Sequence, residues 1–148
     1  MTLPIKLWPN RTFKNNQIQL VAMNFQCKEL TISDEELGFA LTFSDSKSED
    51  RQYLDIDVLI NSEEKYLLIQ RTYPEDEFED DYYYIESSES ERKLGCNDKM
   101  TVKLSREDFE ISWSGDQLKI GLDLTDTELN ELKEIFQVVF KERIILKT

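Results

Sequence analysis

Carboxylates are the side chains most able to do chemistry in this sequence, and six of them fall within residues 75–81: Glu75, Asp76, Glu77, Glu79, Asp80 and Asp81. Such a cluster can bind a divalent cation, supply a catalytic acid and base, or attract a basic partner. A calcium loop needs ligands at fixed alternate positions and a central glycine. The chain has no glycine between Gly38 and Gly95, so no dedicated metal site is predicted.

Catalytic arrangements are poorly represented in the rest of the chain. It contains no histidine, which removes Ser-His-Asp and Cys-His sites and the usual zinc sites. Its four glycines form no phosphate-binding loop, and Cys27 and Cys96 fit no metal or redox spacing. A catalytic carboxylate pair needs two acids in different environments across a cleft, rather than six in one run. We therefore expect a protein that is not an enzyme and has no cofactor.

The acidity of the chain is local. The formal net charge is −13, but residues 75–91 carry nine acids and no base, which leaves 22 acids against 18 bases elsewhere. The first 28 residues carry four bases and no acid. A local negative field repels nucleic acid and acidic membranes and speeds encounter with basic partners. The predicted partner is thus a basic protein, with no nucleic acid or membrane involved.

Length and composition suit one domain over residues 1–148, with a basic extension at 1–16, mostly strands over 17–124 and a helix over 125–141. The chain is 39% apolar and 11% aromatic, which is enough for a real core. No apolar run reaches the ~18 residues of a membrane span, and the first residues show no signal peptide. We expect a reducing cytoplasm, since the two cysteines are few and far apart.

Strand patterns dominate the first two thirds of the chain. Strands are predicted at 17–25, 36–43, 52–60, 65–71, 82–86 and 100–105, with a polar loop at 44–50 and a hairpin joining 52–60 to 65–71. In the second of these, alternation places four side chains on one face: Leu37, Phe39, Leu41 and Phe43.

The last third predicts a hairpin followed by a helix. Residues 109–113 and 118–124 alternate around a Ser-Gly-Asp turn. Thr125 and Glu128 then form a capping box, and apolar residues recur at helical spacing from Leu129 to Phe140. Residues 144–148 suit a short edge strand or a docked tail. The order predicts an α+β fold, with an antiparallel sheet and one long C-terminal amphipathic helix packed on one face.

The acidic run leads directly into the predicted strand 82–86, which places it at a sheet edge. If Tyr83 and Ile85 face the core, Tyr82 and Tyr84 stand exposed beside the carboxylates. Exposed tyrosines often supply packed contacts at interfaces, and nearby charge sets association rate and partner choice. A solvated loop beside tyrosines that merely pack along a sheet is the alternative. The predicted partner-binding residues are Glu75, Asp76, Glu77, Glu79, Asp80, Asp81, Tyr82 and Tyr84.

The segments EKYLLIQRTY (64–73) and DYYYIE (81–86), joined by an acidic connector, resemble immunity protein family ten of bacterial polymorphic toxin systems. The final strand pair and helix, residues 109–136, are also similar, and the resemblance covers about residues 20–141. The family usually has a glycine-rich segment after the second motif, whereas residues 87–99 keep only Gly95. The resemblance implies a non-enzymatic inhibitor, made by the cell that makes the toxin, that binds and neutralises its cognate toxin domain.

A second hypothesis is a structural or regulatory interaction module. In that case the basic first 28 residues of one copy would pair with the acidic run of another copy in a homodimer. The two hypotheses differ in partner, so the sequence leaves the oligomeric state open.

Overall fold

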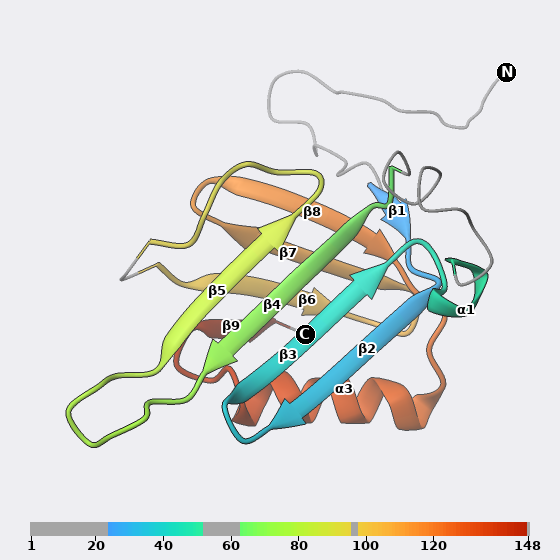
Figure 1. Ribbon diagram of the computed structural model, residues 1–148. Coiled ribbons are helices and arrows are strands. Elements are labelled where there is room, and N and C mark those ends of the chain that lie inside the picture. Colours follow the sequence, from blue (N-terminus) through green and yellow to red (C-terminus); the bar gives the residue numbers. More distant parts are fainter. Residues whose placement is uncertain (1–23, 52–62, 96–97, 148) are drawn as a thin grey trace, which may run out of the picture.

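The computed structural model describes residues 24–51, 63–95 and 98–147, which form a mixed α+β fold with two mostly antiparallel sheets (Figure 1). In chain order the elements are β1 (Phe25–Gln26), β2 (Glu29–Glu35), β3 (Gly38–Ser44), α1 (Ser48–Arg51), β4 (Tyr66–Thr72), β5 (Tyr82–Ser87), β6 (Met100–Leu104), β7 (Asp108–Trp113), β8 (Asp116–Gly121), α3 (Asp126–Val138) and β9 (Ile144–Lys147).

The first sheet has the order β2-β3-β4-β5, and each neighbouring pair is antiparallel. Because side chains alternate along a strand, β3 buries Phe39, Leu41 and Phe43 on one face. Leu67 and Ile69 of β4 pair with the last two of these and are also buried. The strands predicted at 65–71 and 82–86 are confirmed as β4 and β5.

The second sheet has the order β1-β8-β7-β6-β9. Strands β7 and β8 form the predicted hairpin, with Ser114 (φ 45°) and Gly115 (φ 83°) in its turn. Positive φ at both central residues matches the right-handed twist of the strands. The predicted strand at 100–105 is confirmed as β6, while β1 and β9 are outer strands that run parallel to β8 and β6.

The two sheets lie one in front of the other, and α3 runs along one side of them (Figure 1). Three aromatic rings join these layers. The ring of Phe109 in β7 stacks on Phe43 of β3, with 4.5 Å between centroids, and on Phe136 of α3 at 5.7 Å. Both sheets and the helix therefore contribute to one hydrophobic core.

The helix begins as predicted but is shorter than expected. The Thr125 side chain accepts from the backbone N–H of Glu128, and the Glu128 side chain accepts from the backbone N–H of Thr125, so the capping box is confirmed. The long amphipathic helix expected over 125–141 is not confirmed, since α3 has 13 residues and ends at Val138. Phe140 is fully buried beyond its end, and Ile144 then pairs with Met100 to start β9.

Three expectations about the sheets are wrong. There are two sheets rather than one, so the inner face of the first sheet is covered by a second sheet and not by a helix alone. Leu37 does not join the inner face, because it lies in the two-residue turn between β2 and β3 and is 70% exposed. The polar segment 44–50 is not all loop, because Ser44 ends β3 and α1 begins at Ser48.

Strand β2 had no counterpart among the predicted strands. Its inward positions carry only two apolar side chains, Leu30 and Ile32, and it is stabilised by pairing with β3 at the edge of the sheet. The strand predicted at 52–60, most of the strand predicted at 17–25 and the basic extension 1–16 lie outside the described residues.

Gly38, the first residue of β3, lies very close to the backbone of β4. A Cβ at this position would lie 2.6 Å from the carbonyl oxygen of Arg71 and 3.2 Å from the Cα of Thr72. Both are backbone atoms of the neighbouring strand and can move only with it. We expect Gly38→Ala to lower the free energy of unfolding by about 1–3 kcal/mol, measured by urea denaturation. Unchanged stability would contradict this backbone approach.

Candidate functional site

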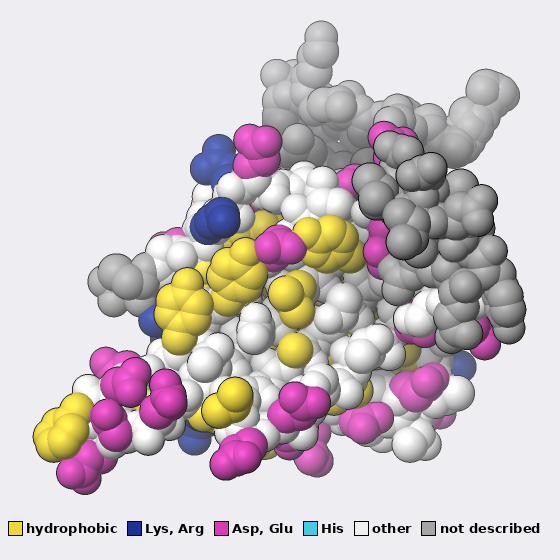
Figure 2. Space-filling view, in the orientation of Figure 1, with side chains coloured by type: hydrophobic (Ala, Val, Ile, Leu, Met, Phe, Trp, Pro, Cys, Tyr) yellow, Lys and Arg dark blue, Asp and Glu magenta, His cyan; other side chains and the backbone are white. Residues whose placement is uncertain are grey.

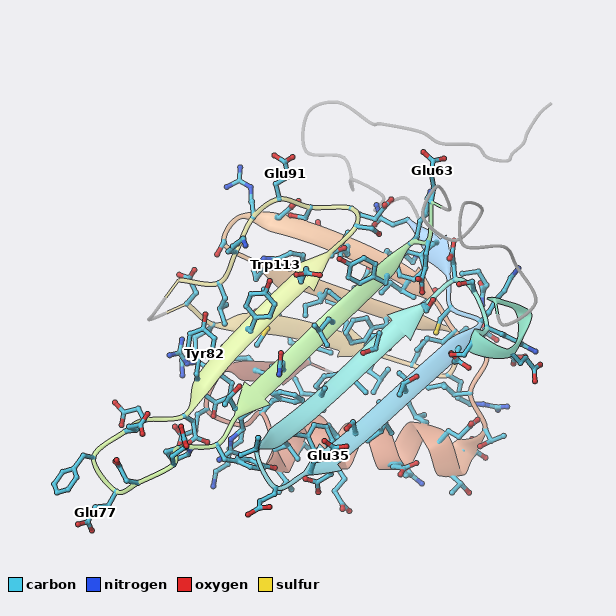
Figure 3. The ribbon with its side chains drawn as sticks, in the orientation of Figure 1. Glu35, Glu63, Glu77, Tyr82, Glu91 and Trp113 are labelled. Atoms are coloured by element: carbon cyan, nitrogen blue, oxygen red, sulfur yellow. The ribbon has the colours of Figure 1, made fainter. Side chains whose placement is uncertain are left out.

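The predicted acidic run lies in the loop that joins β4 to β5, residues 73–81, here called the acidic loop. It extends away from the body of the molecule, with Glu77 near its far end and Tyr82 at its base (Figure 3). Five of the six predicted carboxylates are exposed and form no ion pair within the described part of the chain: Glu75, Asp76, Glu77, Glu79 and Asp80. The loop thus presents a concentrated negative charge to solvent.

Asp81, the sixth carboxylate, has a different environment. It is half-buried and accepts a hydrogen bond from Nε of Arg71. Nη1 of Arg71 also donates to the carbonyl oxygen of Val139, at 2.8 Å, just beyond the end of α3. The guanidinium carbon lies 5.2 Å from the centroid of the Tyr73 ring. Asp81 therefore anchors the base of the acidic loop, so it is a weaker candidate for partner contact than the other five acids.

Phe78 is a candidate binding residue that the sequence reasoning missed. Its side chain is 89% exposed in the middle of the acidic loop, and its backbone N–H donates to Oδ1 of Asp76 at 2.8 Å. An exposed aromatic ring beside charged groups can supply apolar contact to a protein partner. The available signal was one large apolar residue that interrupts a run of acids.

The predicted division of the tyrosines between two faces is confirmed, but Tyr84 is less exposed than expected. Tyr83 and Ile85 are buried in the core, whereas Tyr82 is 62% exposed and Tyr84 is half-buried on the outer face. Strand β5 is the outermost strand of its sheet, which agrees with the predicted edge position. Tyr82 therefore extends the apolar part of the surface from the acidic loop onto the sheet.

A second missed cluster lies on the same outer face. The hydroxyl of Tyr84 donates to Oε1 of Glu86 at 2.6 Å, and the hydroxyl of Tyr66 in β4 donates to Oε2. We call five of the outward side chains of these two strands the tyrosine face: Tyr66, Leu68, Tyr82, Tyr84 and Glu86. The register of β4 and β5 could have suggested this cluster. Leu68 pairs with Glu86, so Tyr66 lies diagonally across from Glu86.

Acidic and apolar side chains share the surface shown in Figure 2. Magenta carboxylates gather on the projecting acidic loop, and yellow side chains continue from its base along β5 and β4. This continuity joins the acidic loop and the tyrosine face into one surface of mixed charge and aromatic character. Such a combination is typical of protein-binding sites, in which aromatic contacts lie beside charged groups.

The hydrogen bonds from the two tyrosines make Glu86 a testable titrating group. The bond from Tyr66, and then the one from Tyr84, lowers the pKa of Glu86 below its ordinary 4.5, and the bond to Glu86 raises the pKa of Tyr66 to about 12. Because the folded pKa of Glu86 is depressed, its stabilising contribution is present above pH 4.5 and is lost as the pH falls through the folded value.

We expect Tyr66→Phe to raise the pKa of Glu86, since it removes the hydrogen bond that lowers this pKa the most. The carboxyl carbon of Glu86 can be followed by NMR during an acid titration of both proteins. Tyr73→Phe is the matched control, because the Tyr73 hydroxyl donates to Asp34 instead. An identical titration curve in wild type and Tyr66→Phe would contradict the hydrogen bond.

The other chemically capable groups show no comparable arrangement. Within the described ranges, no three Asp, Glu, Cys or His side chains converge to suit a metal ion. Sγ of Cys27 donates to the carbonyl oxygen of Glu29 at 3.3 Å, and burial raises the pKa of this thiol. Cys96 lies outside the described residues. Among the described helices, none combines the length and apolar character of a membrane span.

Comparisons with known proteins add no family to this picture. No protein-family model, no curated protein and no solved structure matches the chain. The resemblance to immunity family ten stays a prediction from short motifs, and the partner must be inferred from the chemistry of the acidic loop and the tyrosine face.

Proposed function

We propose that the protein is a non-enzymatic immunity-type inhibitor that binds and neutralises a basic bacterial toxin domain in the cytoplasm of the cell that makes both. The observation that carries the proposal is the acidic loop, in which five exposed carboxylates flank the exposed Phe78 along the chain. Crowded like charges repel each other and lower stability, so a run of acids on one projecting loop suggests a use.

The two kinds of side chain would act at different stages of binding. The carboxylates create a local field that speeds encounter with a basic surface, an effect that salt weakens. Phe78 would supply apolar contact once water is expelled. The Arg71–Asp81 ion pair and the Arg71 bond to Val139 fix the base of the acidic loop, which reduces the entropy lost when the loop binds.

Co-expression in a bacterial host tests the proposal. The probe is the C-terminal domain encoded by the gene next to this one, induced at a level that stops growth. We expect wild-type protein to restore growth and the double variant Glu77→Lys, Asp80→Lys to fail, because two attractive charges of the acidic loop become repulsive.

The matched control is Glu131→Lys, Glu134→Lys, which makes the same change in net charge at two exposed positions of α3. It should protect as well as wild type. Equal loss of protection by both double variants would point to net charge rather than the acidic loop, and full protection by the loop variant would contradict this binding site. If wild-type protein gives no protection, the immunity-type function is wrong for this partner.

A further inference from the structure

The tyrosine face carries a carboxylate between two tyrosine hydroxyls, and we infer that this face docks a basic segment of the partner by receiving an arginine side chain at Glu86. The inference rests on the proposed function, because it adds a second contact for the same basic partner. It assigns a role to Glu86 and Tyr66, which lie outside the acidic loop.

The carboxylate of Glu86 is held in place by two tyrosine hydroxyls and can still accept further hydrogen bonds. Each of its oxygens already accepts one tyrosine hydroxyl, from Tyr84 and from Tyr66. A carboxylate offers about four lone-pair positions, so about two stay available for donors from outside. The side chain is half-buried on the sheet rather than free in solvent. A preoriented carboxylate loses little side-chain entropy when it pairs with an incoming guanidinium.

A cation already lies at this cluster. Nζ of Lys93, an exposed residue in the segment after β5, is 5.8 Å from the centroid of the Tyr84 ring. This distance is within the range of a cation–π contact. The charge of Lys93 also helps to keep Glu86 ionised. The cluster therefore accepts a positive side chain supplied by the chain itself, which an incoming residue would replace.

Arginine suits the cluster better than lysine. Its planar guanidinium can pair with a carboxylate through two parallel hydrogen bonds and stack on an aromatic ring at the same time, whereas an ammonium group is compact and strongly hydrated. Tyr84 and Glu86 lie two positions apart on the same face of β5, so one guanidinium can contact both. The geometry thus favours a guanidinium over an ammonium group.

The surroundings favour a protein segment over a small ion. Beyond Leu68 and Gln70, the outer face continues over the small side chains of Thr42 and Ala40, so a chain can approach the sheet closely. At the other end Tyr82 connects the face to the acidic loop (Figure 3). A basic segment lying on this surface would meet negative charge at Glu86 and again at the acidic loop. Charge at two separate points helps to fix the orientation of a partner.

A peptide titration followed by NMR tests the inference without the natural partner. The probe is a blocked pentapeptide of glycines with arginine at its second and fourth positions, added to the labelled full-length chain. A lysine version is the comparison. We expect backbone shifts at β4 and β5, tighter binding of the arginine peptide, and about 10-fold weaker binding to Glu86→Gln. We expect Lys93→Gln to strengthen binding about 2- to 5-fold by removing the internal competitor.

Two variants with equal charge change serve as controls. Glu134→Gln on α3 removes one negative charge and Lys141→Gln removes one positive charge, both at exposed positions that are not part of the tyrosine face. If Glu86 has only a structural role, Lys93→Gln and Lys141→Gln should change the affinity for the arginine peptide equally. That result would overturn the inference. Shifts confined to residues 73–81 would also overturn it while leaving the proposed function intact. Shifts on neither surface would contradict both.

Discussion

Alanine in place of Phe109 is expected to lower the free energy of unfolding by about 3–5 kcal/mol. The Phe109 ring is fully buried and stacks on Phe43 of the first sheet and on Phe136 of the helix. Its removal leaves a cavity where three layers meet, so no single element can move to close it. Since a domain is stabilised by only about 5–15 kcal/mol, the variant should be partly unfolded at moderate urea concentrations.

Urea denaturation of wild type, Phe109→Ala and Phe78→Ala provides the measurement. Phe78→Ala is the matched control, because it removes the same side chain from an 89% exposed position. Its midpoint should equal that of wild type. A loss below about 1 kcal/mol for Phe109→Ala would mean that this ring does not lie at the junction of the two sheets and α3.

The same Phe78→Ala variant is expected to have the largest effect on partner binding. If the ring is a central apolar contact, its loss costs at least about 2 kcal/mol, or roughly a 30-fold weaker complex. The change should appear mainly in the dissociation rate, since contacts that form after water is expelled affect how long the complex lasts. Surface plasmon resonance with the proposed partner, the domain encoded by the neighbouring gene, immobilised on the chip measures both rates.

Kinetics separate the two parts of the acidic loop. Glu77→Lys, Asp80→Lys should lower the association rate at low salt, and the difference should shrink as salt rises. Phe78→Ala should leave that salt dependence unchanged. Ile145→Ala, which trims a 50% exposed apolar side chain on β9, is the control for Phe78. Equal losses for the two apolar variants would argue against a specific role for the loop.

Elements with strong local signals were predictable from the sequence. The β7–β8 hairpin follows from two alternating segments around Ser114 and Gly115, and the start of α3 follows from the Thr125 capping box. The separation of Tyr83 and Ile85 from Tyr82 and Tyr84 on opposite faces followed from the period of two in a strand, and the structure shows that the first pair is buried. In each case the deciding interactions lie within a few residues of each other, so neighbours in the sequence carry the information.

The candidate site was predictable only in part. Composition identified the five exposed carboxylates and Tyr82, because a run of acids is solvated in almost any fold. It did not separate Asp81 from its neighbours, since the contacts of Asp81 with Arg71 depend on where the end of α3 lies. Nor did it find Glu86, whose partner Tyr66 is 20 residues away in another strand.

Sequence by itself thus determined the composition of the acidic loop, the β7–β8 hairpin and the cap of the helix. Tertiary structure alone decided that there are two sheets, that β9 pairs in parallel with β6 after the chain leaves α3, and that Tyr66 and Tyr84 orient one carboxylate. The physical reason is that local pattern fixes which face of a strand is apolar but not which partner covers it. The partner that covers each apolar face is decided by packing between segments far apart in the sequence, as where Phe109 contacts Phe43 and Phe136.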